Sequence, residues 1–354
     1  MKTKSKLIKP ETKNSIITYA ILIIAFIITQ IMLVTGNMSY MLQDLLVPLC
    51  VYAILAVSLN LTVGILGELS LGQAGFMCIG AYSGALFSNL MSEAIPQAII
   101  RFPIALILGG VIAAIFGILI GIPVLRLRGD YLAIVTLAFG EIIKNICASI
   151  YLGRDADGFH ISLKSVSDMN MAADGKMLIN GALGINGTPR DSNFLIAFII
   201  LFVTVIVSYN FVYSRTGRAV MSIRDNRIAA ESVGINVTKY KLITFALTAF
   251  LAGVAGVIYS HNFSTLQASK FDYNMSILVL VFVVLGGIGS IRGSVIGAVV
   301  LTLIPELLRD TVVGNYRMLF YAIILIAMML FTSNEAFKSR FKNLFVKRKK
   351  GEVK

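Results

Sequence analysis

Runs of apolar residues, separated by short polar stretches, make up most of this chain of 354 residues. An α-helix needs about 20 such residues to cross a bilayer, so the runs predict about ten transmembrane helices. Two of the later runs are short, which is typical of helices that are tilted, broken or sheltered by neighbours. The predicted spans are Ile16 to Val34, Leu45 to Leu66, Leu71 to Leu90, Phe102 to Leu125, Tyr131 to Leu152, Phe194 to Tyr213, Leu242 to Tyr259, Ile277 to Gly289, Val295 to Leu308 and Leu319 to Thr332.

The polar stretches divide the chain into segments with different expected locations. We expect a basic N-terminus over residues 1–15, a transmembrane domain over residues 16–333 and a basic tail over residues 334–354. Residues 153–193 form the longest polar stretch, which is nearly neutral and rich in glycine, and they are predicted to be an outer loop. The size of this loop suits a lid or a docking surface, and the open alternative is a loop that has no function and is merely tolerated by the fold.

Charge is distributed unevenly over the two sides that these spans define. The side with both termini and residues 214–241 carries 22 of the 31 lysines and arginines and 7 of the 18 acids. Because short cytosolic loops carry the excess of positive charge, both termini are expected in the cytosol. The net charge of +13 needs no nucleic acid as a partner, since basic loops and a basic tail beside membrane lipid account for it.

Composition indicates the class of protein. Hydrophobic residues make up 57% of the chain and charged residues only 14%, against about 25% in a soluble domain. Many of the 30 glycines lie inside the apolar runs, where small residues let helices approach each other closely in lipid. We therefore predict an all-α integral membrane protein, with about ten transmembrane helices in one bundle, inverted repeats and both termini cytosolic.

The stretch over residues 214–241, called the basic segment below, lies between two apolar runs. Its sequence is SRTGRAVMSIRDNRIAAESVGINVTKYK. Apolar residues recur there at helical spacing, with Gly217 and Gly234 as breakers, which predicts a short amphipathic helix lying flat on the cytosolic side. Periodicity alone leaves open a surface helix that only touches lipid headgroups.

Two glycine-rich passages each join two apolar runs with almost no loop. The first glycine passage is residues 60–76 and the second is residues 285–297. Glycine lets the backbone turn sharply there, and nearby Ser, Gln and Asn side chains can satisfy backbone groups released from helical hydrogen bonds. Transporters often place their pathways at such breaks, and a tight hairpin that serves packing alone is the open alternative.

Few ionisable residues lie inside the predicted spans. Glu141 and Lys144 are three residues apart in one span, so their side chains can meet on one helix face. We expect a structural ion pair, with a role in a pathway as the alternative, because a lone charge at mid-bilayer is costly. His261, at the outer end of its predicted span, is expected at the membrane interface.

Motifs of the common enzyme classes are missing from the sequence. It holds no G-x-x-x-x-G-K-[ST] loop for nucleotide phosphates, no H-E-x-x-H, no G-x-S-x-G and no clustered Asp motif for Mg²⁺. Cys50, Cys78 and Cys147 have no metal-binding spacing. We therefore expect no enzymatic activity, no metal and no cofactor, so a pump built on this chain takes its energy from another subunit.

Four passages, in the same order and over roughly residues 45–332, resemble a known family. The passages are Ser58 to Tyr82 (SLNLTVGILGELSLGQAGFMCIGAY), Leu127 to Glu141 (LRGDYLAIVTLAFGE), Gly217 to Tyr240, and Val283 to Leu308 (VVLGGIGSIRGSVIGAVVLTLIPELL). They are similar to the permease subunits of bacterial branched-chain amino acid ABC importers, in particular the M-type permeases of the Liv system. The resemblance implies a multi-pass protein of the bacterial plasma membrane that moves Leu, Ile and Val by alternating access.

The same resemblance implies partners and a coupling site. Such importers combine two similar permeases, two cytosolic ATP-binding subunits and an extracellular substrate-binding protein. The basic segment would then be the coupling loop, although Glu231 is displaced from its usual place in the family pattern. The residues implied in coupling to the ATPase are Arg218, Ile223, Arg224, Arg227, Ala229, Ala230 and Gly234.

Substrate choice stays open at this point. A zwitterion with an aliphatic side chain needs few fixed charges along its path, and urea or short amides agree with the sequence equally well. An ion-coupled secondary amino acid carrier is the alternative from another class, for which Glu141 is the available buried acid. The residues expected to line a pathway are Asn60, Ser70, Gln73, Thr136 and Glu141.

Overall fold

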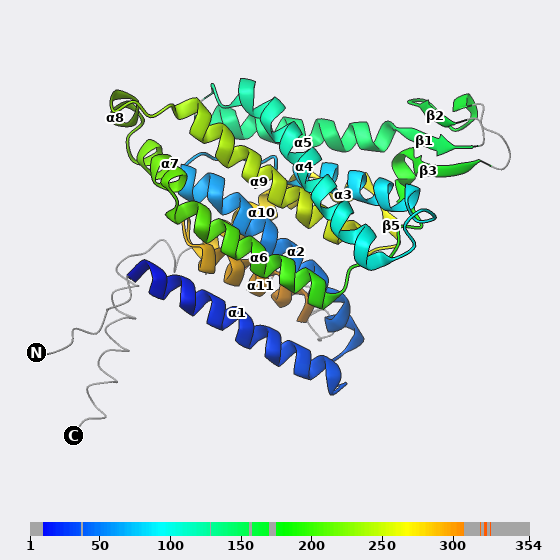
Figure 1. The fold of residues 1–354 in the computed structure, drawn as a ribbon, viewed down its shortest axis with the longest axis horizontal. Coiled ribbons are helices and arrows are strands. Elements are labelled where there is room, and N and C mark those ends of the chain that lie inside the picture. Colours follow the sequence, from blue (N-terminus) through cyan, green and yellow to red (C-terminus); the bar gives the residue numbers. More distant parts are fainter. Residues whose placement is uncertain are drawn as a thin grey trace, which may run out of the picture.

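A computed structural model describes residues 10–36, 38–127, 129–155, 158–169 and 175–307, together with positions 319, 322, 323 and 326. Among these residues, nine helices of 14 residues or more form one bundle (Figure 1). Their bounds are α1 Pro10–Val34, α2 Tyr40–Asn60, α3 Gln73–Leu90, α4 Ala98–Val124, α5 Asp130–Ser149, α6 Phe194–Tyr213, α9 Val237–Ser260, α10 Tyr273–Gly286 and α11 Ile291–Leu307.

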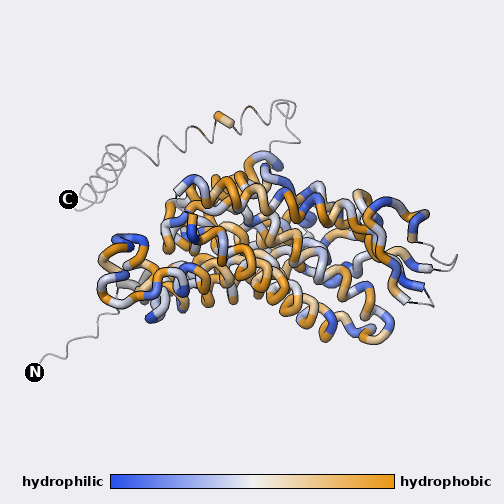
Figure 2. Tube along the Cα trace, turned by 90° about the horizontal axis from the view of Figure 1, so that it is seen from above, coloured by the Kyte–Doolittle hydropathy of each residue, from blue (hydrophilic) through white to orange (hydrophobic). Residues whose placement is uncertain are grey.

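These helices coincide with nine of the ten predicted spans. Seven membrane-spanning candidates are long and apolar enough to cross a bilayer; α3 and α11 are not among them. The tenth predicted span, Leu319 to Thr332, and the basic tail lie outside the continuously described residues, so the number of ten crossings stays a prediction. The hydropathy of the chain agrees with a membrane location, because apolar residues follow the helices and hydrophilic ones gather toward the two ends of the bundle (Figure 2).

The two ends of the bundle carry different additions. At one end, called the basic end, lie two short helices of the basic segment, α7 (Arg215–Asp225) and α8 (Arg227–Ser232); the start of α1 points toward this same end (Figure 1). At the other, called the sheet end, β1 (Tyr151–Arg154) pairs antiparallel with β2 (Phe159–Ser162) and with β3 (Lys176–Asn180). The strand order is β2-β1-β3, and a smaller pair joins β4 (Ile185–Asn186) to β5 (Thr265–Leu266).

The bundle is helical, as predicted for an all-α membrane protein, and the short strands lie almost entirely in the stretch that was predicted to be a turn-rich outer loop. The fifth predicted span ends too late, because Tyr151 and Leu152 belong to β1 and not to α5. Short 3-10 turns at Ser167–Met169 and Gly181–Leu183 complete the described part of this region. β1, β2 and β3 are only four or five residues long and β1 contains Gly153, so they leave little alternation in the sequence.

The core lies where α9 packs against α3 and α4, the two helices with which it makes its most extensive contacts. Close approach of the backbones explains part of the glycine content. A Cβ atom on Gly80 of α3 would overlap the backbone of Gly253 in α9. Small residues at such crossings allow close van der Waals packing, which stabilises helix association in lipid, where the hydrophobic effect between helices is absent.

Candidate functional site

The basic segment folds as two helices and not as the single amphipathic helix predicted. Ser214 caps α7 by accepting a hydrogen bond from the Gly217 amide (3.0 Å), and Asn226 caps α8 by accepting one from the Ala229 amide (3.1 Å). Side-chain oxygens at these positions satisfy backbone amides that have no partner within the helix. Asn226 therefore divides the segment, and Gly217 lies inside α7 and does not break it.

A small core holds these two helices against the start of α9. Ile223, Ala230 and Val237 are buried together. Val233, in contrast, is 76% exposed and Ile228 is 79% exposed, so the predicted apolar face is only partly used within the chain. Apolar side chains that gather outside a local core are typical of surfaces that contact another protein or a membrane.

The coupling residues implied by the resemblance differ in burial and in contacts. Ile223 and Ala230 are buried in the small core, and Gly234 adopts a φ of +85° that a glycine tolerates. Arg218 and Ala229 are exposed on the surface of α7 and α8. Arg224 and Arg227 also make specific contacts. Arg227 pairs with Glu231 one helical turn away (2.9 Å).

Arg224 joins the basic segment to the first glycine passage. Its Nη1 donates a hydrogen bond to the Gly64 carbonyl oxygen (3.0 Å), while its Nη2 contacts Asp225 (2.9 Å). Its aliphatic stem covers Gly67, where any Cβ would overlap it. Gly64 belongs to a π-helical turn, Leu61–Leu66, that continues α2, and Gly67 ends that turn with a φ of +79°. π-helical turns are frequent at functional sites because they leave backbone groups for other partners.

The two glycine passages, more than 200 residues apart in the chain, lie against each other at the same place. The Gly289 amide donates to Asn60 Oδ1 (2.8 Å). A Cβ on Gly64 would overlap both the Gly289 backbone and the Asn60 side chain. Gly287 and Gly289 have φ values of +98° and +83°, so the turn between α10 and α11 depends on glycine.

A second connection runs from α9 to the segment between the π-helical turn and α3. Lys241 is 4% exposed and forms an ion pair with Glu68. A cleft of about 770 Å³ adjoins this pair and is bounded by the first glycine passage, the start of α5 and the basic segment. Arg224 and Asp130 are among its lining residues. The basic segment is therefore attached to the broken helices at two points beside an open volume.

Four of the five predicted pathway residues are buried: Asn60, Ser70, Gln73 and Thr136. Thr136 Oγ1 accepts a hydrogen bond from the Leu71 amide (2.9 Å), and Gln73 donates to Ser58. Thr136 thus satisfies a backbone amide released at the first glycine break, as expected of a polar residue beside broken helices, and Gln73 joins the start of α3 to α2. In this conformation none of the four lines the cleft described above, the groove between α1, α2, α6 and α11, or the cavity between α2, α10 and α11.

Glu141 is the fifth predicted pathway residue, and the structure gives it two partners. It forms the expected ion pair with Lys144. Its Oε1 also accepts a hydrogen bond from the Tyr273 amide at the start of α10 (2.8 Å). An acidic group at a helix N-terminus is stabilised by the unsatisfied amides there. Glu141 therefore fixes α5 to α10.

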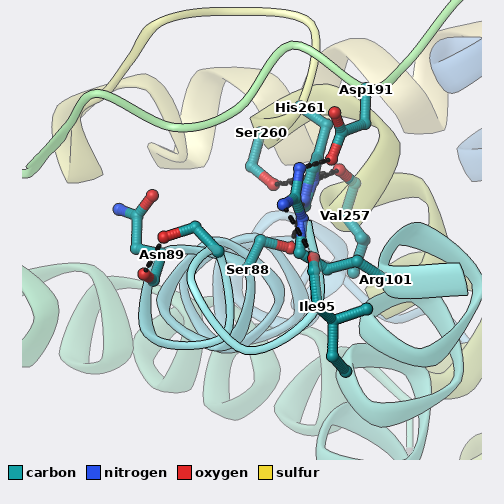
Figure 3. A network of polar contacts seen from close by, with 9 residues as sticks. Ser88, Asn89, Ile95, Arg101, Asp191, Val257, Ser260 and His261 are labelled. Carbon is teal, nitrogen blue, oxygen red and sulfur yellow. Dashed lines mark hydrogen bonds and ion pairs between the residues drawn. The ribbon is translucent and has the colours of Figure 1, made fainter. Parts of the chain in front are cut away.

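Sequence reasoning missed a polar network at the sheet end (Figure 3). Arg101 and Asp191 form an ion pair of 2.6 Å, with side chains only 7% and 10% exposed. His261, expected at an interface, is instead fully buried; its Nε2 lies 2.7 Å from Ser88 Oγ and its Nδ1 lies 2.8 Å from the Val257 carbonyl oxygen. The network ties the start of α4, the segment before α6 and the end of α9 together.

The geometry defines a class before any comparison. Seven helices of the described residues can cross a bilayer. One glycine break joins α2 to α3 and another joins α10 to α11, the two breaks contact each other, and the basic segment is attached to the first of them. Together these are features of a multi-pass transport protein. Among the described residues, no cluster of three or more His, Cys, Asp or Glu side chains is arranged to hold a metal ion.

Comparison with known proteins identifies the family. The profile of the family described as "Branched-chain amino acid transport system / permease component" matches residues 41–329, so the chain belongs to this family. It is a permease of the ATP-binding-cassette type and a multi-pass protein of the plasma membrane.

The relatives in several organisms are permease proteins of import or transport systems. The high-affinity branched-chain amino acid transport system permease protein LivM of Salmonella typhimurium is 32% identical over 299 residues, which are 81% of this chain and 68% of that protein. LivM of Escherichia coli is 32% identical over 292 residues, 79% of this chain and 66% of that protein. The ribose import permease protein RbsC of Haemophilus influenzae is 25% identical over 288 residues, 79% and 81% of the two chains. The chain thus spans about two thirds of the length of the two LivM proteins, and no solved structure matches it significantly.

Proposed function

We propose that this chain is a permease subunit of an importer for branched-chain amino acids, driven by separate ATPase subunits. The observation that carries the proposal is its similarity to two LivM proteins over about four fifths of the chain. The partners would be a second permease, two cytosolic ATP-binding subunits and an extracellular substrate-binding protein. A relative named LivH, 24% identical over 252 residues, belongs to a system of the same name and supports a second permease.

The basic end would face the cytosol. The excess of Lys and Arg on the side with residues 214–241 supports this orientation, since positive residues are retained inside. The start of α1 lies toward the same end (Figure 1), which agrees with a cytosolic N-terminus. Residues 153–193 would then face the exterior, where the binding protein would dock.

Coupling would pass through α7 and α8. The exposed Ile228 and Val233 supply an apolar surface for the ATPase subunit, with Arg218 and Ala229 on the same short helices. A rigid displacement of these helices would reach the first glycine passage through Arg224, because packed interfaces switch between discrete arrangements. Because Gly64 packs against Gly289, the same displacement would also shift the second glycine passage.

The pathway would lie beside these breaks. Asn60, Ser70, Gln73 and Thr136 are already gathered at the first of them, so a small displacement there would expose polar groups to a passing substrate. Glu141, which links α5 to α10, would respond to the same movement. We propose that these five residues line the pathway in other conformations of the transport cycle.

Uptake into proteoliposomes tests the proposed function. Vesicles containing this chain, the second permease and the ATPase subunits should accumulate labelled leucine only with ATP inside and binding protein outside. Valine and isoleucine should compete, whereas ribose and urea should not. Leucine accumulation by this chain alone under an ion gradient would contradict the proposal and favour a secondary carrier. Uptake of ribose in preference to leucine would place the chain with its sugar-importing relatives.

A further inference from the structure

The outer face of β2 and of the residue that follows it carries large apolar side chains at alternate positions. Phe159, Ile161 and Leu163 are 58%, 68% and 69% exposed, and they are called the apolar strip below. The residues between them, His160 and Ser162, are polar and less exposed, and Ser162 is buried. An antiparallel sheet with one face in water normally shows the reverse pattern, with apolar residues inward and polar residues outward. The strip therefore indicates that another molecule covers this face.

β2 is also an edge strand. In the order β2-β1-β3 it pairs with β1 alone among the described strands, so the backbone groups along its other side have no strand partner within the described part of the chain. An edge strand with exposed apolar side chains readily contacts another chain. Both the side chains and the backbone of β2 are thus available at the outside of the sheet.

Lengths decide between lipid and protein as the covering molecule. α5 has 20 residues and spans about 30 Å, which is the thickness of the hydrocarbon core. After one further residue, β1 continues away from the bundle (Figure 1), and its four residues add about 13 Å. The headgroup layer on each side of a bilayer is only about 5–8 Å thick. Because Phe159 pairs with Arg154 at the far end of β1, the strip begins beyond the headgroups, where a protein can cover it and lipid cannot.

Charge beside the strip specifies this protein further. The Arg154 guanidinium carbon lies 5.8 Å from the centre of the Phe159 ring, and Lys164 directly follows the strip. Both cationic side chains are exposed. They complement a surface that carries acidic residues beside an apolar spot, and such electrostatic complementarity sets specificity and association rate. A second copy of the same surface would bring like charges together, so the covering protein is a different one.

We propose that the apolar strip, together with Arg154 and Lys164, is the docking surface for the substrate-binding protein. The strip lies at the sheet end, opposite to α7 and α8, so a protein reaches it from the exterior when the basic end faces the cytosol. The docked protein packs apolar side chains on the strip and pairs Asp or Glu side chains with the two cations. This inference rests on the proposed function, which it deepens by assigning the docking contact to β2 and by naming the chemistry of the opposing surface.

Photocrosslinking identifies the covering molecule. Phe159 is replaced by the photoreactive p-benzoylphenylalanine in the complete transporter, which is reconstituted in lipid nanodiscs with purified, leucine-loaded binding protein. Illumination should join position 159 to the binding protein. The same replacement at Phe116, an exposed position within α4, is the control and should give no adduct with the binding protein. Adducts of position 159 with lipid alone or with the second permease alone, or no adduct at all, would contradict the proposal.

Transport kinetics measures the contribution of the strip. Ile161→Asp places an acid at its centre and should raise the binding-protein concentration for half-maximal leucine uptake about tenfold or more, with the maximal rate preserved. Arg154→Gln should raise this concentration about threefold and reduce its dependence on salt, because a cation at the rim is lost. Leu183→Asp is the matched control: it alters an exposed apolar residue after β3, at the other edge of the sheet, and should leave the concentration unchanged.

The outcomes separate the docking surface from the proposed function. If Ile161→Asp behaves like Leu183→Asp while the unaltered complex takes up leucine with ATP and binding protein, the docking surface is wrong and the proposed function stands. If the unaltered complex takes up no leucine under these conditions, the proposed function is rejected and this inference falls with it. The aromatic replacement at Phe159 conserves the ring, so crosslinking stays decisive even where Ile161→Asp impairs assembly.

Discussion

The two ends of the bundle each bury an ion pair, yet the surroundings of the pairs differ. At the sheet end, the Arg101–Asp191 pair is enclosed, and Arg101 Nη1 also donates to the Ile95 carbonyl oxygen (3.2 Å). At the basic end, the Lys241–Glu68 pair adjoins a cleft of about 770 Å³. A buried pair without free volume fixes the segments that it joins, whereas a pair beside a cleft connects segments that have room to move. We infer that the sheet end is the rigid end and that the basic end is the one that moves.

The largest expected effect is at the rigid end. Asp191→Ala leaves the Arg101 charge buried without its partner, which should destabilise the fold by about 3–5 kcal/mol. Thermal unfolding of the purified chain in detergent measures the change. A variant that combines Arg101→Met with Asp191→Leu removes both charges and should recover most of the loss. An unaltered unfolding temperature for Asp191→Ala would mean that the network is not rigid.

The next effect concerns the contact between the two glycine passages. Gly64→Ala inserts a Cβ into the space held by Gly289 and Asn60, and overpacking of this kind costs about 1–3 kcal/mol. Gly140→Ala is the control, because its Cβ would find its nearest neighbour, the Gly75 amide nitrogen, at 3.6 Å. Thermal unfolding of the two variants should differ clearly. Equal unfolding temperatures would show that the passages separate readily.

Arg224→Met should impair transport more than folding. The guanidinium that reaches the Gly64 carbonyl is lost, while the side chain still covers Gly67. Because coupling between sites is typically worth 5–150-fold, leucine uptake per ATP hydrolysed should fall about tenfold or more. Arg215→Met alters another exposed arginine of α7, at the opposite end of that helix and outside the proposed coupling set, and should keep the normal ratio. A normal ratio for Arg224→Met would remove Arg224 from the coupling route.

The smallest effect is a pH dependence at the sheet end. Burial lowers the pKa of His261, although the Val257 carbonyl and the Asp191 carboxylate act in the opposite direction. The unfolded chain therefore binds the proton more tightly, so this contribution to stability is present above the unfolded pKa of about 6.5 and is lost as pH falls below it. His261→Gln removes the titrating group. Between about pH 7.5 and about pH 5.5, the unfolding temperature of the variant should fall less than that of the unaltered chain; an equal fall would contradict the assignment.

The sequence was informative where the signal is a long apolar run and much less so where short polar segments fold against it. Nine helices follow directly from runs that must satisfy their backbone groups within the membrane. The strands at residues 151–180 were missed because each is too short to show a period. Asn226 was read as part of one amphipathic helix, although Asn is among the preferred capping residues and could have revealed the division into α7 and α8.

The roles of individual charges were the hardest part to predict. Arg224 and Lys241 were counted as cytosolic charges of the basic segment, but each contacts a residue about 160 or more positions away in the first glycine passage. Such partners depend on how the helices pack, which no local pattern encodes. The same holds for Arg101 and Asp191. They lie in separate polar stretches of the sequence and form their ion pair only because α4 and α6 pack together in the fold.

Site-directed labelling at Ile228 tests the central claim most directly, that the basic end faces the cytosol and receives the ATPase subunit. The variant carries Ile228→Cys, with Cys50, Cys78 and Cys147 replaced by Ser, and Ile228 is 79% exposed. The account predicts that a membrane-impermeant maleimide labels this cysteine in inverted vesicles but not in intact cells, and that a short crosslinker joins it to the ATPase subunit. Labelling from the outside of intact cells, or failure to crosslink any ATPase subunit in an actively transporting complex, would contradict it.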